Sequence, residues 1–269
     1  MAPSLLQVWA FLKRDYVLAS ASPLAYAWQV AGVLLVAPLL HYVGRLIPGS
    51  RHLEPFGGSY SAFVVLGLAV FGFLSAGTTT VGAAVRQEQT VGTLEAILAT
   101  PLSLISLVLG AALWPLIVAG VSMLLYLIIA RWAFGADLTT ANILSGAMIL
   151  ALALPSAVAL SVLGAAMVLV FRHPDPITGL FTAVSAVLAG VFYPTTVLPP
   201  VLQRLAEFLP WTHALRAVRL AVLQGYGPGA LQRELVVLAG FAALLVPVSI
   251  AVFRRALQYA KAAGTLHTY

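Results

Sequence analysis

Apolar residues fill long uninterrupted stretches of this chain, and polar residues gather in the segments between them. A membrane-spanning helix needs about 20 mostly apolar residues, because the hydrocarbon core is about 30 Å thick and a helix rises about 1.5 Å per residue. Six stretches meet this requirement, and none contains Asp, Glu, Lys or Arg. They are Pro23–Gly44, Tyr60–Val85, Leu104–Ala130, Ile143–Phe171, Ile177–Tyr193 and Leu235–Phe253. The pattern predicts an all-α, polytopic membrane protein with six transmembrane helices.

The residues before the first stretch repeat with a helical period. The apolar positions are Leu5, Val8, Trp9, Leu12 and Tyr16, and the polar positions are Gln7, Arg14 and Asp15. We expect an amphipathic helix that lies in the membrane interface, the alternative being an extension of the first span. Basic residues follow this apolar run rather than precede it, which is opposite to the order in a cleavable signal peptide. We therefore expect the N-terminal segment to stay in the mature protein.

The segment between the fifth and sixth stretches is too interrupted to span. Pro199 precedes a short amphipathic run that Pro210 ends, and a second helix is expected to begin near Thr212 as its N-cap and to stop at Gly225. We expect a helical hairpin that dips into the membrane surface, or a folded loop on it. Its residues of interest are Pro194, Pro199, Leu202, Leu205, Pro210, Arg216 and Arg219.

Composition agrees with this pattern. Hydrophobic residues make up 61% of the 269 residues and charged residues 8%, whereas soluble domains carry about 25% charged residues. The formal net charge is +6, but the basic residues are scattered, so nucleic-acid binding is not expected. The chain has no Cys, which excludes disulfides, thiolate metal sites and Cys nucleophiles. No internal repeat or long linker is apparent, and we expect one domain over residues 1–269.

The distribution of Lys and Arg does not settle the orientation by itself. Six spans place both termini on one side, with seven basic residues on each side of the membrane. Four of the seven on the far side lie in the segment 194–234, and leaving that segment out favours cytoplasmic termini by seven to three.

The sequence contains no sign of its own catalytic chemistry. No Gly-Lys pair occurs, so a P-loop is excluded, and no His-Glu-x-x-His motif is present. The five His residues are far apart, and we expect no metal site. Charge-free spans argue against a carrier driven through a buried carboxylate. We therefore expect a protein that is not an enzyme.

The most informative polar segment follows the second stretch, from Arg86 to Ser103. Thr93 is a candidate cap for a short amphipathic helix, which Thr100 and Pro101 would close. Such a helix on the membrane surface suits docking to another protein, and an ordinary solvated connector is the alternative. The candidate residues are Arg86, Glu88, Gly92, Thr93, Leu94, Glu95, Ile97, Leu98, Thr100 and Pro101.

The run from Glu88 through Gly92-Thr93-Leu94-Glu95 to Thr100-Pro101 resembles the cytoplasmic loop of ABC transporter type-2 permeases, the membrane subunits of ABC exporters. A second stretch, from Gly190 through Tyr193-Pro194 and Leu209-Pro210 to Arg219, is similar to that family's region before its last span. The resemblance covers essentially the whole chain.

This resemblance implies a coupling role for the 86–103 loop against a separate ATP-binding subunit. It implies two permease subunits, as a homodimer, paired with two ATP-binding subunits that hold ATP and magnesium, while this chain binds no cofactor. It places the protein in the cell membrane among lipids, with cytoplasmic termini and an extracytoplasmic hairpin.

Cargo and subunit contact are less defined by the sequence. Apolar spans suit a hydrophobic or amphipathic cargo of the drug-efflux kind. The small residues Ser185, Ala186, Ala189 and Gly190 allow close helix contact between two copies, with packing inside one subunit as the alternative. An ATP-independent channel or carrier and a non-transport membrane scaffold remain rival functions.

Overall fold

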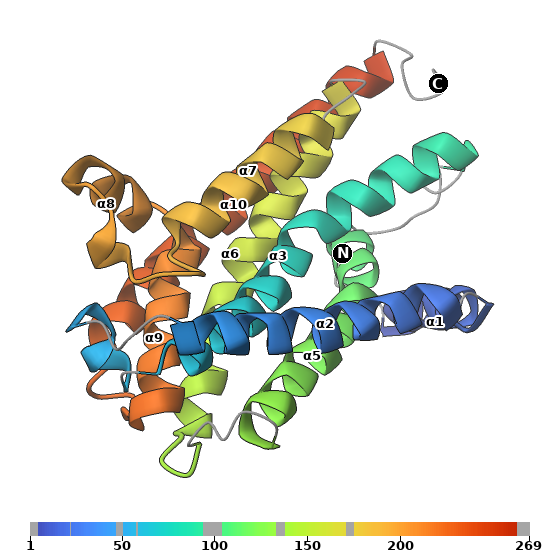
Figure 1. Cartoon of the computed structure of the whole chain (residues 1–269). Coiled ribbons are helices and arrows are strands. Elements are labelled where there is room, and N and C mark those ends of the chain that lie inside the picture. Colours follow the sequence, from blue (N-terminus) through green and yellow to red (C-terminus); the bar gives the residue numbers. More distant parts are fainter. Residues whose placement is uncertain are drawn as a thin grey trace.

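The computed structural model describes residues 5–21, 23–46, 51–57, 59–93, 104–132, 138–170 and 175–262. These residues form helices joined by turns, without a strand among them, which confirms the predicted all-α class (Figure 1). The α-helices are α1 (Leu5–Ala21), α2 (Pro23–Leu46), α3 (Tyr60–Val91), α5 (Leu104–Trp132), α6 (Ile143–Val170), α7 (Asp175–Leu188), α8 (Pro200–Glu207), α9 (Pro210–Gln224) and α10 (Gln232–Ala262). The 3₁₀ turns are η1 (Arg51–Phe56) and η2 (Thr195–Val197).

Within the described residues, α3, α5, α6 and α10 are long and apolar enough to cross a membrane. They correspond to the predicted second, third, fourth and sixth spans. The described parts of α2 and α7 give shorter apolar helices, Leu34–Val43 and Gly179–Leu188. The chain is therefore a multi-pass membrane protein, and the count of six spans stays a prediction.

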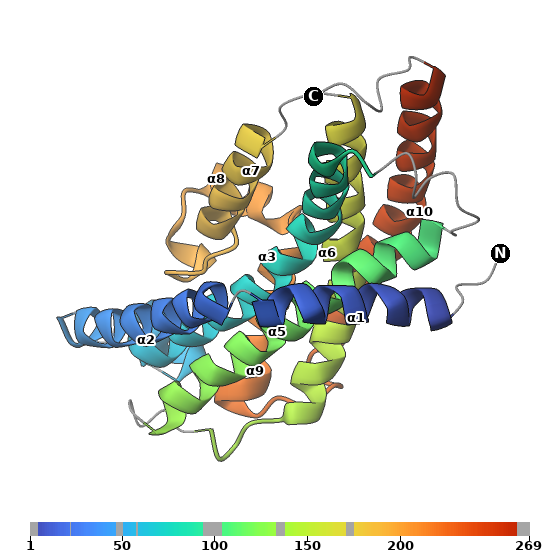
Figure 2. The same cartoon turned by 90° about the vertical axis from the view of Figure 1, so that its right-hand side faces the viewer.

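The helix α3 lies at the centre of the bundle. It packs along α5 and α6, and α6 packs along α10 (Figures 1 and 2). Gly82 brings α3 close to α6, because a Cβ there would already lie 3.6 Å from the backbone of Gly164. The buried Ser161 hydroxyl accepts a hydrogen bond from the Val81 N–H at 2.8 Å. Close approach and such hydrogen bonds hold helices together in lipid, where apolar side chains gain little by leaving the solvent.

The helix α9 is a core element, and the hairpin that α8 and α9 were expected to form at the membrane surface stays a prediction. It packs against α6, α3 and α10, and most of its side chains are buried. It begins at Pro210 with Leu209 as its N-cap, so Thr212 is not the cap. Proline suits the first helical position, because its fixed φ matches the helix and its missing N–H would have no partner there. The helix ends at Gly225, as predicted.

The helix α7 ends at Leu188, before the predicted end of the fifth span at Tyr193. Gly190 has a φ of 74°, and the Val191 N–H donates to the Ala186 carbonyl at 3.2 Å. Glycine adopts this left-handed conformation without a steric penalty, and the reversal it makes closes the helix.

The small residues in the last turn of α7 and just after it face the interior of the chain. Ser185 and Ala189 are 1% and 2% exposed, Gly190 is buried, and Ala186 is half-buried. Ala189 belongs to the main core, and Ala186 packs against that core. These residues therefore pack within one chain, which is the alternative named from the sequence, and a contact between two copies through them stays a prediction.

Candidate functional site

The helix α3 continues six residues past the predicted end of its span, to Val91. Its 32 residues correspond to about 48 Å, well over the hydrocarbon thickness of about 30 Å. Arg86 and Glu88 therefore lie on the last turns of α3 and not in a loop. Gly92 and Thr93 end the helix, and the Thr93 N–H donates to the Glu88 carbonyl at 2.9 Å. We call residues 86–93 the α3 tip.

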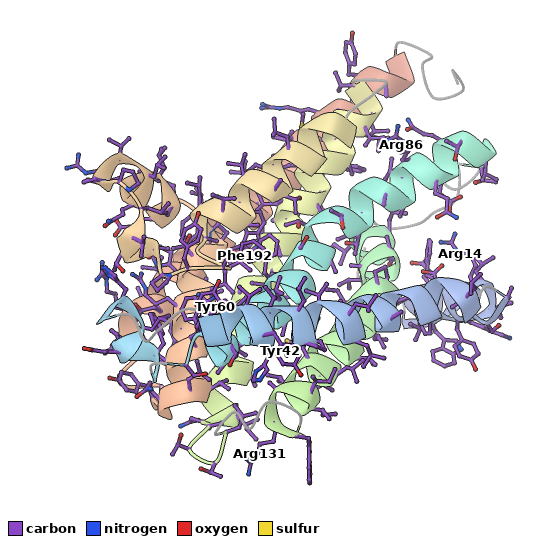
Figure 3. The ribbon with its side chains drawn as sticks, in the orientation of Figure 1. Arg14, Tyr42, Tyr60, Arg86, Arg131 and Phe192 are labelled. Carbon is purple, nitrogen blue, oxygen red and sulfur yellow. The ribbon has the colours of Figure 1, made fainter. Side chains whose placement is uncertain are left out.

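Glu88 joins the α3 tip to α1. Its carboxylate accepts a hydrogen bond from the Arg14 guanidinium at 2.6 Å and another from the Thr93 hydroxyl. Arg14 also pairs with Asp15 at 3.0 Å. Burial by itself lowers the pKa of Arg14, but the hydrogen bonds to Asp15 and Glu88 outweigh burial and raise that pKa. Figure 3 shows Arg14 on α1 below the end of α3.

The helix α1 is also fastened to α5. The ring of Phe11 lies against Gly110, where a Cβ would come within 2.6 Å of it. The ring of Tyr16 meets Trp114 edge-on, with centroids 5.7 Å apart. The α3 tip, α1 and α5 are therefore joined through α1. The remaining coupling-loop candidates lie outside the described residues: Leu94, Glu95, Ile97, Leu98, Thr100 and Pro101.

A cavity of about 560 Å³ separates α7 from α3 and α6. Its polar lining includes Thr78, Thr79 and Arg86 on α3 and Thr182 on α7. A second cavity of about 210 Å³, between α3, α6 and α7, shares the three threonines. We call the two together the α7 cavity. It offers hydroxyl groups and one cationic side chain in apolar surroundings, which suits an amphipathic molecule.

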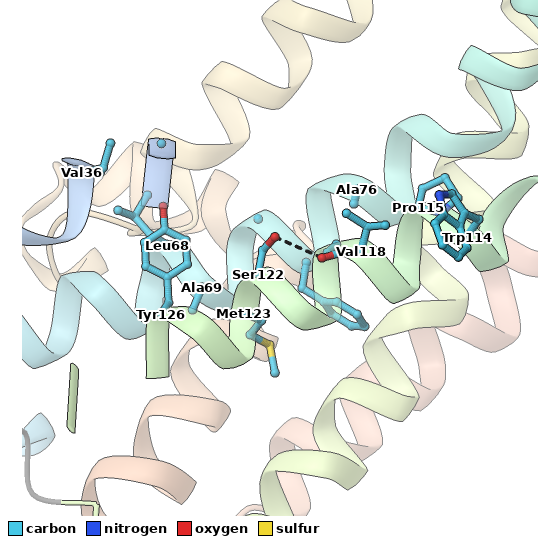
Figure 4. A pocket seen from close by; sticks show the side chains of 14 residues that line it. Val36, Leu68, Ala69, Ala76, Trp114, Pro115, Val118, Ser122, Met123 and Tyr126 are labelled. Carbon is cyan, nitrogen blue, oxygen red and sulfur yellow. Dashed lines mark hydrogen bonds between the residues drawn. The ribbon is translucent and has the colours of Figure 1, made fainter. Parts of the chain in front are cut away.

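Two further cavities lie elsewhere in the bundle. One of about 550 Å³ lies between α2, α3 and α5 and is lined by aromatic and small side chains (Figure 4). Its Ser122 hydroxyl donates to the Val118 carbonyl at 3.0 Å, so that donor is used within α5. The other, of about 470 Å³, lies between α5, α6 and α10 and is almost wholly apolar. The lining of this last cavity suits hydrocarbon rather than polar groups, whereas the first also carries the polar groups of Tyr126 and Trp114.

Arg219 lies at the opposite end of α7 from Arg86, and it is 3% exposed. Its guanidinium donates to the carbonyls of Phe63, Gly190 and Val191 at 3.2, 2.8 and 2.8 Å. It also stacks 3.5 Å from the centre of the Phe63 ring. We call this contact between α9, α3 and the end of α7 the Arg219 joint. Arginine does not deprotonate in proteins, so this buried guanidinium carries its charge.

Sequence reasoning placed Arg219 in the hairpin before the last span and missed this role. The neighbouring residues in the sequence could have indicated burial. Ala217, Val218 and Ala221 are small and apolar, and all three are buried.

The other hairpin candidates do not gather around a cavity. Pro194 is buried, Pro199 precedes α8, Leu202 is half-buried and Leu205 is exposed. Pro210 begins α9.

Arg216 joins α9 to α10. Its guanidinium pairs with Glu234 at 3.5 Å and donates to His213 Nδ1 at 3.2 Å. Burial lowers the pKa of His213, and a neutral imidazole fits its contacts, since Nε2–H can donate to the Glu207 carbonyl at 3.0 Å. In the part of the chain that is described, no three His, Asp or Glu residues lie together as a metal site.

One family model, described as ABC-2 type transporter, matches residues 6–223. The chain belongs to the ABC-2 type transporter family. The match runs from α1 into α9, so it contains the α3 tip, the α7 cavity and the Arg219 joint. This ABC-2 chain is thus the permease component of an ABC transporter rather than the catalytic component. Members of the family generally dimerise and work with an ATP-binding subunit. The comparison with curated proteins gives no match.

Proposed function

We propose that this ABC-2 chain is the membrane-spanning subunit of an ATP-driven exporter for hydrophobic or amphipathic cargo. The observation that supports this most is the course of α3. One continuous helix carries the α3 tip at its end and lines the α7 cavity with Thr78, Thr79 and Arg86. A force on the tip therefore acts directly on a wall of the cavity.

The ATP-binding subunit supplies that force in this proposal. Two copies of it hold ATP and magnesium, close on each other and push on residues 86–103. Glu88 and Arg14 tie α1 to the α3 tip, so both helices respond as one unit. Coupling of this kind needs an element with two discrete arrangements that both sites bias.

The cargo follows from the lining of the α7 cavity. Thr78 donates its hydroxyl to the Ser75 carbonyl at 2.7 Å, so it contributes an acceptor lone pair more readily than a donor. Arg86 lies at the tip end and suits an acceptor on the cargo. Apolar side chains make up the rest, such as Phe71 and Val168. An amphipathic molecule with a polar end near Arg86 fits this distribution.

The second permease subunit is a copy of the same chain in this proposal. The outward side of α7 carries Leu180, Val184 and Val187, which are 66%, 45% and 47% exposed. Their spacing of four and three residues forms one apolar stripe. Two such stripes bury each other in a homodimer and bring the two α7 cavities side by side.

We place the protein in the cell membrane with both termini in the cytoplasm. The helix α2 has 24 residues and is long enough for a span. The helix α7 has 14 residues and is about 21 Å long. The bare carbonyls that follow it are covered by Arg219, which is how irregular backbone is tolerated at membrane depth. Six crossings therefore remain our proposal.

The test is assembly and cargo-stimulated ATP hydrolysis with a co-expressed ATP-binding subunit. Leu94→Asp and Glu95→Arg are expected to abolish both, since they alter the proposed docking loop. Thr79→Trp fills the α7 cavity and is expected to abolish stimulation by cargo while leaving assembly intact. Its control is Leu124→Trp, at an exposed position on α5.

Transport that persists without ATP, or variants that behave like the wild type, would replace this proposal with an ATP-independent channel or carrier. A chain that assembles with partners but moves no cargo would be a scaffold.

A further inference from the structure

The two ends of α7 are held in different ways. Along its N-terminal half, the α7 cavity separates Gly179 and Thr182 from α3 and α6. At its C-terminal end, the Arg219 joint fastens the carbonyls of Gly190 and Val191 to α9 and α3. The helix otherwise packs mainly on α8 and α3, and Figure 2 shows it to one side of α3 and α6. It is thus fixed at one end and flanked by open space at the other.

The Arg219 joint is difficult to separate. Its three hydrogen bonds are charge-assisted and buried, and pulling the carbonyls away would leave a guanidinium without acceptors in a dry site. Gly67 makes room for it, because a Cβ there would lie 2.1 Å from the Arg219 Nη2 and 2.6 Å from the Val191 carbonyl oxygen. The joint therefore depends on a specific notch in α3 as well as on the arginine.

A layer of aromatic rings lies between the joint and the cavity. The buried Trp211 ring contacts Phe71 on α3 with centroids 6.2 Å apart and Phe181 on α7 with centroids 5.4 Å apart. Phe71 and Phe181 both line the α7 cavity. Two side chains of α9 therefore close this end of the cavity. Trp211 lies nearer the cavity, and Arg219 lies beyond it.

We propose that Arg219 is the pivot of α7, a positioning residue that keeps the C-terminal end of α7 attached to α3 throughout transport. The α7 cavity then changes size by movement of the N-terminal end of α7, and cargo does not leave between α3 and α7 past Trp211. This inference rests on the proposed function in one respect, since ATP hydrolysis by the partner subunit would drive the movement of α7.

The movement can be measured with pairs of spin labels, because the chain has no Cys. One pair, Gln87→Cys with Gly179→Cys, reports on the tip end of α3 and the N-terminal half of α7, and a Cβ at Gly179 meets nothing within 4 Å. The other pair, Tyr60→Cys with Phe192→Cys, reports on the joint, and both positions are marked in Figure 3. Distances are measured by double electron–electron resonance in the assembled complex, without nucleotide and after trapping with ATP and vanadate. We expect the first distance to change and the second to stay constant.

Matched glycine variants test the joint without removing a charge. Gly67→Ala inserts a methyl group against Arg219, whereas Gly72→Ala on the same helix meets nothing within 4 Å. We expect Gly67→Ala to broaden the Tyr60–Phe192 distance distribution and to lower cargo transport by about tenfold, the factor that loss of one charged hydrogen bond in a buried site brings. Gly72→Ala should match the wild type in both. Arg219→Lys keeps the charge but loses the fork of donors, and it should broaden the distribution as Gly67→Ala does.

The outcomes separate this inference from the proposed function. A joint distance that changes as much as the other pair would overturn the pivot while leaving ATP-driven transport intact. If nucleotide changes neither distance, the proposed function fails. The pivot is then tested by the variants in the permease without its ATP-binding subunit. If neither Gly67→Ala nor Arg219→Lys broadens the Tyr60–Phe192 distance distribution, the pivot is overturned.

Discussion

Single glycines set how closely the helices of this ABC-2 permease approach each other. Gly67 makes room for the Arg219 guanidinium, Gly82 admits the backbone of α6, and Gly110 admits the ring of Phe11. In lipid these contacts matter more than apolar burial, because the surrounding hydrocarbon competes for every apolar side chain. Replacing one of these glycines with a larger residue should therefore weaken helix packing more than replacing an apolar side chain on the lipid-facing surface.

At Gly82 the tolerance is graded. A Cβ would lie 3.5 Å from the Ala165 nitrogen, an ordinary contact, so Gly82→Ala should change stability by less than about 1 kcal/mol. Gly82→Leu places a larger side chain against the backbone of α6, beside the α7 cavity, and should cost about 1–3 kcal/mol. Thermal unfolding of the purified protein in detergent measures both, and Gly72→Leu is the control. Equal melting temperatures for Gly82→Leu and the wild type would contradict the packing described for α3 and α6.

Elements differ in how well the sequence predicted them. The predicted second span ended at Val85, where charged residues begin. Charged residues indicate where the hydrocarbon ends but not where the helix ends, and α3 continues past Glu88 to Val91. The burial of α9 was missed, because its two arginines imitate a solvated surface and only tertiary contacts with Phe63 and Gly190 satisfy Arg219. The long apolar helices were predictable from length and composition, because a stretch of about 20 residues without charge can satisfy its backbone in lipid only as a helix.

The contact of α1 with the α3 tip is testable by charge exchange. The Arg14–Glu88 pair is partly exposed, so breaking it should cost about 1 kcal/mol of stability or less. Its effect on coupling should be larger, because α1 would no longer follow the tip. We expect Glu88→Arg to lower cargo-stimulated ATP hydrolysis severalfold and the Arg14→Glu, Glu88→Arg double variant to restore most of it. If the double variant is no better than Glu88→Arg, the pair does not act as a unit.

For the whole molecule, the length of α3 constrains the orientation. A helix of about 48 Å extends beyond a core of about 30 Å, and the α3 tip is the polar end that must be in water. The α8 end of the molecule lies on the opposite face in the proposed arrangement. Single Cys residues at Gln89 and Gln203 test this, with an impermeant thiol reagent on intact cells. We expect Gln203→Cys to react and Gln89→Cys to react only after permeabilisation; the reverse pattern would invert the topology.

The Arg219 joint also has a consequence for biosynthesis. The guanidinium and its Phe63 acceptor are separated by 156 residues, so α3 leaves the ribosome long before α9 exists. During that interval the carbonyls at the end of α7 have no cation, and the notch at Gly67 stands open. Insertion of the apolar helices alone therefore gives an incomplete molecule, and the emergence of α9 completes it. We expect chains that stall before α9 to be recognised and degraded by membrane proteases. The burial of Arg219 is therefore the step that completes folding.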